Sequence, residues 1–238
     1  MTSSLLRFLI LETSGRIGRV AVAEGQRLLA EQKLDETRRH ARDLAPAVQS
    51  LLQSQGWQPR DVAAVLVNLG PGSYTGLRVG VMSAKAWAYA TGCGLLGIQS
   101  FQAIAHGVLA ATQNSESEAC VEVLADAQQG KVYCQRFRRS PTSPSPDAAS
   151  KLLIRPAAEW LADLPEGILV AGPGLRLHAE AARQRGKIVA EQFWDPQPRD
   201  LLALGLARWL RGERDEVLAL EPLYARRSSA EENWAKRT

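Results

Sequence analysis

Apolar residues recur along this chain with two different periods, and the changes of period divide it into short elements. Short runs rich in Val, Ile and Leu predict β-strands, whereas apolar residues spaced three and four apart predict helices. The elements predicted in the first half are strands Arg7–Glu12, Ile17–Ala23 and Leu28–Leu34, helix Arg39–Gln55, strand Val62–Val67, helix Val79–Ala90, strand Leu95–Ile98 and a helix from Phe101.

The second half repeats part of this order. Its predicted elements are strands Cys120–Ala125, Val132–Phe137 and Leu152–Ile154, helix Pro156–Ala162, strand Ile168–Ala171, and helices Leu175–Arg185 and Asp200–Arg211. Three strands, a helix, a strand and a helix form the order of a ribonuclease-H-like unit. The sequence therefore predicts an α/β protein of two such units, at residues 1–112 and 113–238, with mixed sheets flanked by helices. The Ser- and Pro-rich residues 140–150 predict a mobile surface loop.

A glycine-rich segment joins the predicted strand Val62–Val67 to the helix Val79–Ala90. Its candidate functional residues are Gly70, Gly72, Ser73, Thr75, Gly76 and Arg78. Glycines allow close backbone approach, and a helix that begins after such a loop can gather N–H groups around an anion or a partner's backbone. The alternative is a tight connection whose glycines only permit packing. Both interpretations remain open from the sequence.

The familiar phosphate and nucleophile motifs do not match this segment. A P-loop needs a Lys after its last Gly, where Leu77 stands, and the dinucleotide fingerprint needs a Gly at Thr75. A nucleophile elbow around Ser73 needs a Gly at Pro71, and no base for Ser73 can be identified. We therefore predict no catalytic residue in this segment.

The histidines predict no metal site either. Glu36 and His40 are one helical turn apart and could share a face. A Glu/His pair alone supplies only two ligands, fewer than a protein metal site normally has. His106 and His178 are remote from them in sequence. Asp126 could serve as an acid or phosphate-site group, although a strand-end turn is the simpler role for it.

Composition and charge favour an ordinary globular protein. The 238 residues are 45% hydrophobic and 23% charged, with a net charge of +4. Clusters such as Arg38-Arg39-Arg42 and Arg226-Arg227 are typical of solvated faces, so direct RNA contact stays an open alternative. The three cysteines lack metal or redox spacing, and no leader or bilayer-spanning run is recognised. We expect a cytoplasmic protein without membrane contact.

The predicted helix Arg39–Gln55 carries one apolar stripe, and the predicted helix Val79–Ala90 is apolar on more than one side. One face of each must cover its own sheet, and the extra apolar face favours a protein interface; the alternative is that both helices only cover that sheet. In the second helix, Gly80, Ala84 and Ala88 form a row of small residues that lets another helix approach closely. The candidate interface residues are Leu44, Val48, Gly80, Ala84, Trp87 and Ala88.

Several segments, taken in order, resemble one bacterial family. Gly70–Gly80 with Met82–Ala86 resembles the signature stretch of the TsaB (YeaZ) family, in the glycoprotease-like branch of the actin/sugar-kinase/Hsp70 superfamily. Further similar segments are Ile10–Ser14, Asp126–Tyr133, Gly172–Gly174 and Pro222–Arg226. The departures are Glu12, where Asp is usual in the family, and Gln128 and Lys131 in the second segment.

The resemblance implies a role in modifying tRNA. It implies a non-catalytic subunit that holds TsaD, the transferase of threonylcarbamoyl to adenosine, in an active form. TsaE is expected to dock on the pair, and tRNA to bind through the complex. The two helices are implied to pack against TsaD or a second copy of the chain. TsaD carries two histidines four residues apart, but here Leu44 follows His40 at that distance.

The resemblance implies no cofactor for the chain itself, with ATP and Mg²⁺ entering at the level of the complex. The alternative is an ATP-dependent small-molecule kinase or ATPase of the same superfamily, with Glu12, Thr13 and Gly72–Gly76 around phosphates. A protease, suggested only by the family's older name, finds neither a metal pair nor a triad in the sequence.

Overall fold

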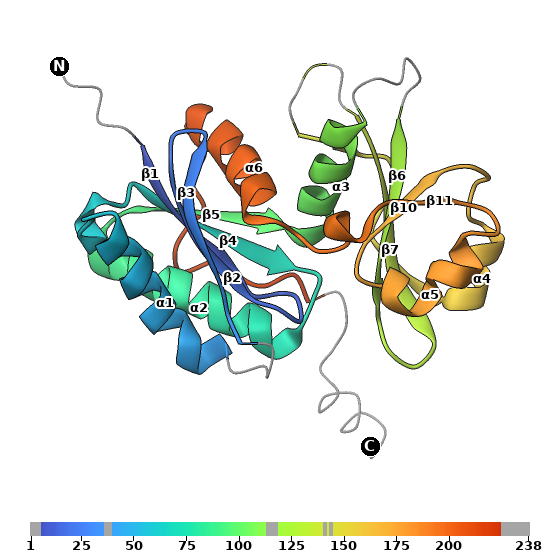
Figure 1. Cartoon of the computed structure of the whole chain (residues 1–238), viewed down its shortest axis with the longest axis horizontal. Helices are drawn as coiled ribbons and strands as arrows, with labels where there is room; N and C mark the ends of the chain where they lie inside the picture. Colours follow the sequence, from blue (N-terminus) through green and yellow to red (C-terminus); the bar gives the residue numbers. More distant parts are fainter. Residues whose placement is uncertain (1–5, 36–39, 113–118, 140–141, 143–144, 225–238) are drawn as a thin grey trace.

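The computed structural model describes residues 6–35, 40–112, 119–139, 142 and 145–224, which form two sheets with helices against them (Figure 1). The first sheet has the strand order β3-β2-β1-β4-β5. Its strands are β1 (Arg7–Glu12), β2 (Arg19–Glu24), β3 (Arg27–Lys33), β4 (Ala64–Gly70) and β5 (Gly94–Gln99). β1, β2 and β3 are antiparallel neighbours, whereas β4 and β5 run parallel to β1. The predicted mixed sheet is confirmed.

The helices of the first half are α1 (His40–Ser54), α2 (Tyr74–Thr91) and α3 (Ser100–Ala111), with a short 3₁₀ turn η1 (Pro59–Asp61). The prediction for the start of α2 was wrong, because the helix begins at Tyr74 and not at Val79. Ser73 is its N-cap, and the Ser73 Oγ accepts the Gly76 N–H at 3.3 Å. The glycine segment is therefore a shorter loop than the sequence predicts. Glu36 lies outside the described residues.

The second sheet has the order β11-β10-β6-β7-β8, and β9 also pairs with β7. Its elements are β6 (Cys120–Asp126), β7 (Lys131–Arg138), β8 (Asp147–Ala148), β9 (Leu153–Pro156), α4 (Ala157–Ala162), β10 (Leu169–Ala171), α5 (Leu175–Ala182), β11 (Lys187–Ile188), η2 (Glu191–Phe193) and α6 (Pro198–Leu210). β8 lies within the predicted loop 140–150 and pairs with the end of β7, which corrects the prediction for that part. Residues 140, 141, 143 and 144 lie outside the described residues.

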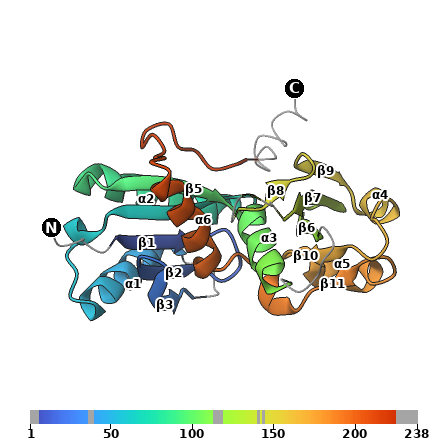
Figure 2. The same ribbon diagram turned by 90° about the horizontal axis from the view of Figure 1, so that it is seen from above.

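The two units exchange helices. α3 comes from the first half of the chain, yet its Phe101 and Val108 pack with Val121 of the second sheet. α6 comes from the second half, yet its Leu201 packs with Phe8 of the first sheet. Figures 1 and 2 show α3 and α6 side by side between the two sheets.

The sequence predicts that residues 198–224 belong to the second unit. In the structure they pack on the first unit, so this assignment is corrected. At the crossing, His106 Nδ1 of α3 lies 2.9 Å from Asp200 Oδ1 of α6. Asp200 is buried, and Gly107 leaves room for its carboxylate since a Cβ there would lie 2.8 Å from Asp200 Oδ2. Sequence order and packing therefore divide this chain differently.

After α6, residues 213–224 form a segment without helix or strand, here named the C-terminal arm, which has a turn at 217–219 and contacts β5 and α2. The Asp215 N–H donates to the Leu95 carbonyl at 2.9 Å, and the Leu223 N–H donates to the Leu69 carbonyl at 2.7 Å. The Lys85 ammonium of α2 donates to the Leu218 carbonyl at 2.8 Å. At the outer edge of β5, the arm thereby supplies partners for the Leu95 carbonyl and, through the Asp215 carboxylate, for the Gly97 N–H.

We expect that Leu201→Ala in α6 destabilises the first unit. Leu201 is fully buried against the first sheet, so the substitution should lower the free energy of unfolding by about 2–5 kcal/mol. The matched control is Leu210→Ala in the same helix, where the side chain is 68% exposed and the effect should stay within about 0.5 kcal/mol. Urea denaturation followed by circular dichroism measures both. Equal effects of the two substitutions would contradict the placement of α6.

Candidate functional site

A buried carboxylate lies where the first hairpin turn begins. Glu12, the last residue of β1, is 1% exposed. One of its carboxylate oxygens accepts the Ser14 N–H at 2.6 Å, the Ser14 hydroxyl at 2.7 Å and the Gly15 N–H at 3.3 Å. The other oxygen accepts a hydrogen bond from the Asn68 side-chain amide. Both oxygens of Glu12 are therefore bound by the chain itself.

Asn68 and Ser100 complete this network, and sequence reasoning assigned neither of them a role. Asn68 of β4 is fully buried, and its carbonyl oxygen accepts the Ser100 hydroxyl at 2.7 Å and the Gly70 N–H at 2.8 Å. The network thus joins the end of β1, the end of β4 and the start of α3. The signal that could have found Asn68 is a polar residue directly after the apolar run of β4.

The environment of Glu12 changes its acidity. Burial raises the pKa of the Glu12 carboxyl above its usual value, because an ionised carboxylate loses its hydration there. Hydrogen bonds from Ser14, Asn68 and Gly15 to the carboxylate lower that pKa and offset part of the rise. Removal of one of these donors should therefore favour the protonated form of Glu12 further.

The signature glycines pack against the turn that follows Glu12. A Cβ at Gly72 would lie 2.6 Å from the Ser14 carbonyl oxygen, and a Cβ at Gly76 or Gly80 would overlap atoms of Thr13. The Thr13 hydroxyl donates to the Gly76 carbonyl at 2.7 Å. These glycines let two segments of the chain touch, so the packing interpretation accounts for them. The space that a phosphate would need beside them holds Thr13 and Ser14.

The other residues predicted in this segment have separate surroundings. Gly70 has a φ of +102°, in the region that favours glycine. Ser73 caps α2, and Thr75 is exposed in its first turn. The exposed Arg78 donates to the Tyr74 hydroxyl at 3.1 Å. Among the described residues, the hydrogen bonds therefore link neither the Ser73 nor the Thr75 hydroxyl to Arg78.

The predicted partner-interface residues need a correction. Leu44, Val48, Gly80, Ala84 and Ala88 are all buried and pack within their own unit, so they do not form an exposed surface. Trp87 is half-buried against the same core. The row of small residues Gly80, Ala84 and Ala88 packs against Thr13 and the first sheet, and not against a helix of a partner.

The exposed apolar residues of α2 lie on a different face of the helix. Met82 is 60% exposed, Tyr89 is 80% exposed and Tyr74 is 39% exposed. At 100° per residue, these three positions fall within one side of the helix. The ring of Tyr74 also lies 4.8 Å from that of Tyr224 in the C-terminal arm. We name this exposed surface of Tyr74, Met82, Tyr89 and Tyr224 the α2 face.

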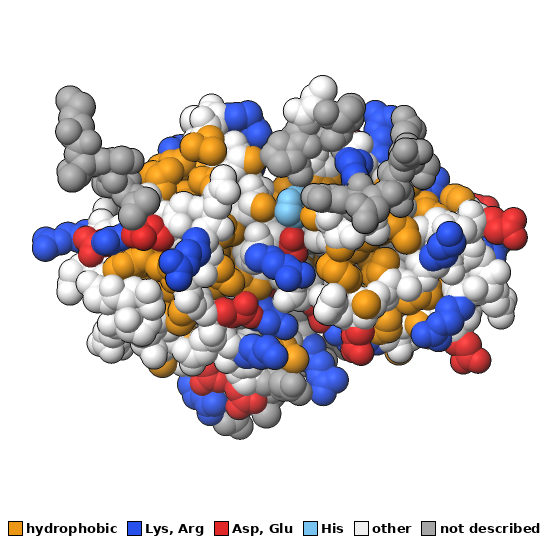
Figure 3. Space-filling view, turned by 45° about the horizontal axis from the view of Figure 1, so that its top comes forward, with side chains coloured by type: hydrophobic (Ala, Val, Ile, Leu, Met, Phe, Trp, Pro, Cys, Tyr) orange, Lys and Arg blue, Asp and Glu red, His pale blue; other side chains and the backbone are white. Residues whose placement is uncertain are grey.

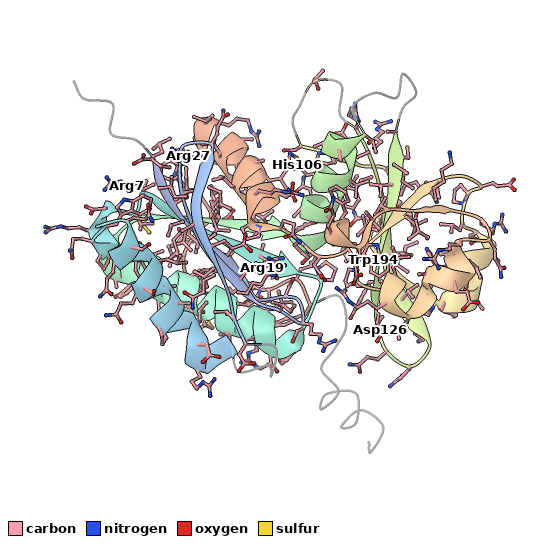
Figure 4. All side chains as sticks on the ribbon, viewed as in Figure 1. Arg7, Arg19, Arg27, His106, Asp126 and Trp194 are labelled. Atoms are coloured by element: carbon pink, nitrogen blue, oxygen red, sulfur yellow. The ribbon has the colours of Figure 1, made fainter. Side chains whose placement is uncertain are left out.

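The candidate residues of the second unit are structural in this conformation. Asp126 Oδ1 accepts the Gln128 N–H at 2.8 Å, which forms the strand-end turn between β6 and β7. Figure 4 shows Asp126 at this turn, across from Arg19 of β2 in the first unit. Among the described residues, no group of three or more His, Cys, Asp or Glu could hold a metal ion.

Charged side chains of both signs lie on the face of the described residues that Figure 3 shows. Lys and Arg side chains are present on both units there, with acidic side chains among them. Several of these arginines form ion pairs, such as Arg176 with Asp195 at 2.6 Å and Arg19 with Glu31 at 2.5 Å. Within the described part of the chain, no helix is long and apolar enough to cross a membrane.

Comparisons with known proteins agree with this geometry. The family model described as "TsaD: tRNA N6-adenosine threonylcarbamoyltransferase" matches residues 27–234. The tRNA threonylcarbamoyladenosine biosynthesis protein TsaB of Bacillus subtilis is 27% identical over 96% of this chain and 98% of its own length. TsaB of Escherichia coli is 24% identical over 84% of each chain.

A solved structure from Pseudomonas aeruginosa, of a protein with similarity to peptidase YEAZ, is 26% identical. It superimposes with a TM-score of 0.77 over 93% of this chain and 100% of its own. Two mixed sheets with exchanged helices define an α/β protein of the actin-like fold. The chain belongs to the TsaB (YeaZ) family, within the wider group that the matching family model describes.

We expect Gly80→Ala to destabilise the fold by about 1–3 kcal/mol, because its Cβ would overlap the Thr13 hydroxyl. In a Thr13→Ala background the next atom is the Cβ of residue 13, at 3.4 Å, so most of this effect should disappear. A double-mutant cycle in urea denaturation measures the coupling. Gly92→Ala, whose cost comes from a φ of +72° and not from contact with Thr13, serves as the uncoupled control. Additive effects of the two substitutions at 80 and 13 would contradict the proposed contact.

The raised pKa of Glu12 predicts a pH dependence of stability. Because its folded-state pKa lies above the unfolded value, Glu12 contributes more stability below the unfolded pKa, and this contribution is lost as pH rises through the folded pKa. The stability difference between wild type and Glu12→Gln should therefore move in favour of the wild type from pH 7 to pH 5. Denaturation curves at several pH values test this, with exposed Glu166→Gln as control. Parallel pH profiles for wild type and Glu12→Gln would refute it.

Proposed function

We propose that this chain is a non-catalytic subunit in the biosynthesis of tRNA threonylcarbamoyladenosine, and that it binds a transferase of the TsaD family and holds it active. Family membership supports the pathway, since curated relatives are named for this modification. We further propose that ATP, Mg²⁺, TsaE and tRNA enter at the level of the assembled complex.

The observation that carries the non-catalytic role is the use of both Glu12 oxygens by the chain itself. A carboxylate that organises Mg²⁺ needs an oxygen directed at the metal or its water shell. Here the N–H groups of Ser14 and Gly15, at the turn where the kinase alternative places phosphates, already donate to Glu12. ATP chemistry at this turn would require that buried network to open.

The α2 face supports the docking part of the proposal. Exposed large apolar residues gathered on one helical face are typical of protein interfaces. Met82 and Tyr89 supply that area, and α2 contains Arg78 and Lys85 but no Asp or Glu. A partner surface with apolar and acidic residues fits this composition. The same face could pair two copies of the chain, which the experiment below distinguishes.

We expect Tyr89→Glu to weaken association with the TsaD-family protein of the same organism by about 30-fold or more, as loss of an aromatic interface residue commonly does. The control is Leu177→Glu on α5, where the native side chain is 68% exposed but lies in the other unit. Calorimetry measures association, and light scattering of each protein alone reports homodimers. Modification of tRNA should need both proteins, and it should fall in parallel with affinity.

Two outcomes would each refute one part of the proposal. The first is unchanged association of the folded Tyr89→Glu variant, which would refute docking through the α2 face. The second is robust ATP hydrolysis or tRNA modification by the isolated chain with Mg²⁺, which would favour the kinase or ATPase alternative.

A further inference from the structure

A pocket of about 420 Å³ lies between the two units, at the carboxyl end of β5. Its lining includes neither Glu12 nor Asp126, so it is separate from the two hairpin turns. Figure 2 shows the end of β5 and the start of α3 on one side and β7 and β8 on the other. The C-terminal arm contributes Glu213, Asp215 and Leu220 to the lining.

The charged groups of the pocket are bound to one another. Arg208 pairs with Asp215 at 2.9 Å and with Glu213 at 2.7 Å, and Arg211 pairs with Glu213 at 2.6 Å. Asp215 also accepts the Gly97 N–H at 2.7 Å. The two guanidinium groups and two carboxylates cancel in charge, so the pocket offers no unpaired cation to a phosphate or carboxylate.

Three glutamine side chains supply the remaining polar groups. Gln99 ends β5, Gln102 lies in the first turn of α3, and Gln135 lies on β7 of the other unit. The Gln135 amide donates to the Ser150 carbonyl at 3.1 Å, which leaves its own oxygen as an acceptor. Among the described residues, Gln99 and Gln102 have no side-chain hydrogen-bond partner. Carboxamides from three elements thus line one pocket.

Apolar side chains form the rest of the wall. Leu69 of β4, Phe137 of β7 and Leu220 of the arm line the pocket beside the glutamines. A neutral, flat ligand with both donors and acceptors on its edge matches this combination. A carboxamide can donate one hydrogen bond and accept another at the same time. Gln does this with adenine, where its NH₂ donates to N7 and its oxygen accepts from the N6 amino group. Small-molecule pockets commonly measure ~300–1,000 Å³, so a nucleoside fits the volume.

We propose that this pocket binds a nucleobase, adenine above the others, presented by a free nucleoside or by an unpaired position of an RNA. The glutamines read the edge of the base, and Leu69, Phe137 and Leu220 hold its faces. The site goes beyond the proposed docking function, because it does not involve the α2 face and can be measured on the isolated chain.

The test is a titration of the full chain with adenosine, purine riboside and AMP, followed by NMR or calorimetry. Adenosine should bind saturably and more tightly than purine riboside, which lacks the amino group. AMP should bind no more tightly than adenosine, because the cations of the pocket are paired. An RNA hairpin with an unpaired adenine, compared with a fully paired one, distinguishes RNA from free nucleoside as the source of the base.

Variants assign the binding to the pocket. Gln99→Leu combined with Gln102→Leu should weaken adenosine binding by about tenfold or more through loss of two hydrogen-bonding side chains. Gln53→Leu, at an exposed position of α1 outside the pocket, is the control and should bind as the wild type does. Circular dichroism confirms that each variant is folded.

Three results would overturn the assignment: no saturable binding of adenosine at millimolar concentration, equal affinity for adenosine and purine riboside, or unchanged binding in the double variant. None of these would bear on association with a TsaD-family partner. Conversely, unchanged association of the Tyr89→Glu variant would say nothing against nucleoside binding. Each proposal can therefore be refuted without the other.

Discussion

The close approach between the turn after β1 and the first turns of α2 constrains the rest of the structure. Thr13 and Ser14 fill the space that Gly72, Gly76 and Gly80 leave, and Glu12, 1% exposed, accepts hydrogen bonds on both carboxylate oxygens. A buried carboxylate is stable only when its oxygens are hydrogen-bonded, so the ends of β1, β4 and the start of α3 are held together. The turn after β1 is thereby held against the first turns of α2.

This constraint also explains the division of roles on α2. One side of the helix is committed to Thr13 and the sheet, which buries Gly80, Ala84 and Ala88. The opposite side carries Met82 and Tyr89 in solvent. A helix that is apolar on two sides therefore has one internal contact and one surface available to a partner, and the two sides use different residues.

Much of the fold could be predicted from the sequence, and the candidate site less so. The strands β1, β4 and β6 are long apolar runs, so their positions were clear. β8 and β11 have two residues each, too few to show a period. The start of α2 was misplaced because glycines weaken helix propensity, whereas the Ser73 cap and tertiary packing stabilise the helix there.

The site residues show the same limit. A small-residue row such as Gly80, Ala84 and Ala88 indicates a close approach, but it does not say whether a partner or the same chain makes it. Here Thr13, more than sixty residues earlier, makes it. Likewise, the sequence does not show that the Ser100 hydroxyl donates to Asn68. Nor does it show that Gln135 lines a pocket with residues of the other unit.

The C-terminal arm has one more consequence. Lys85 of α2 binds carbonyl groups of the arm at Leu218 and Leu220, and the arm also carries Asp215 to the space between the units. The arm therefore contacts both α2 and the pocket between the units. A ligand in the pocket and a protein on α2 influence each other only if both shift the arm, and each would then change the affinity for the other by the same factor.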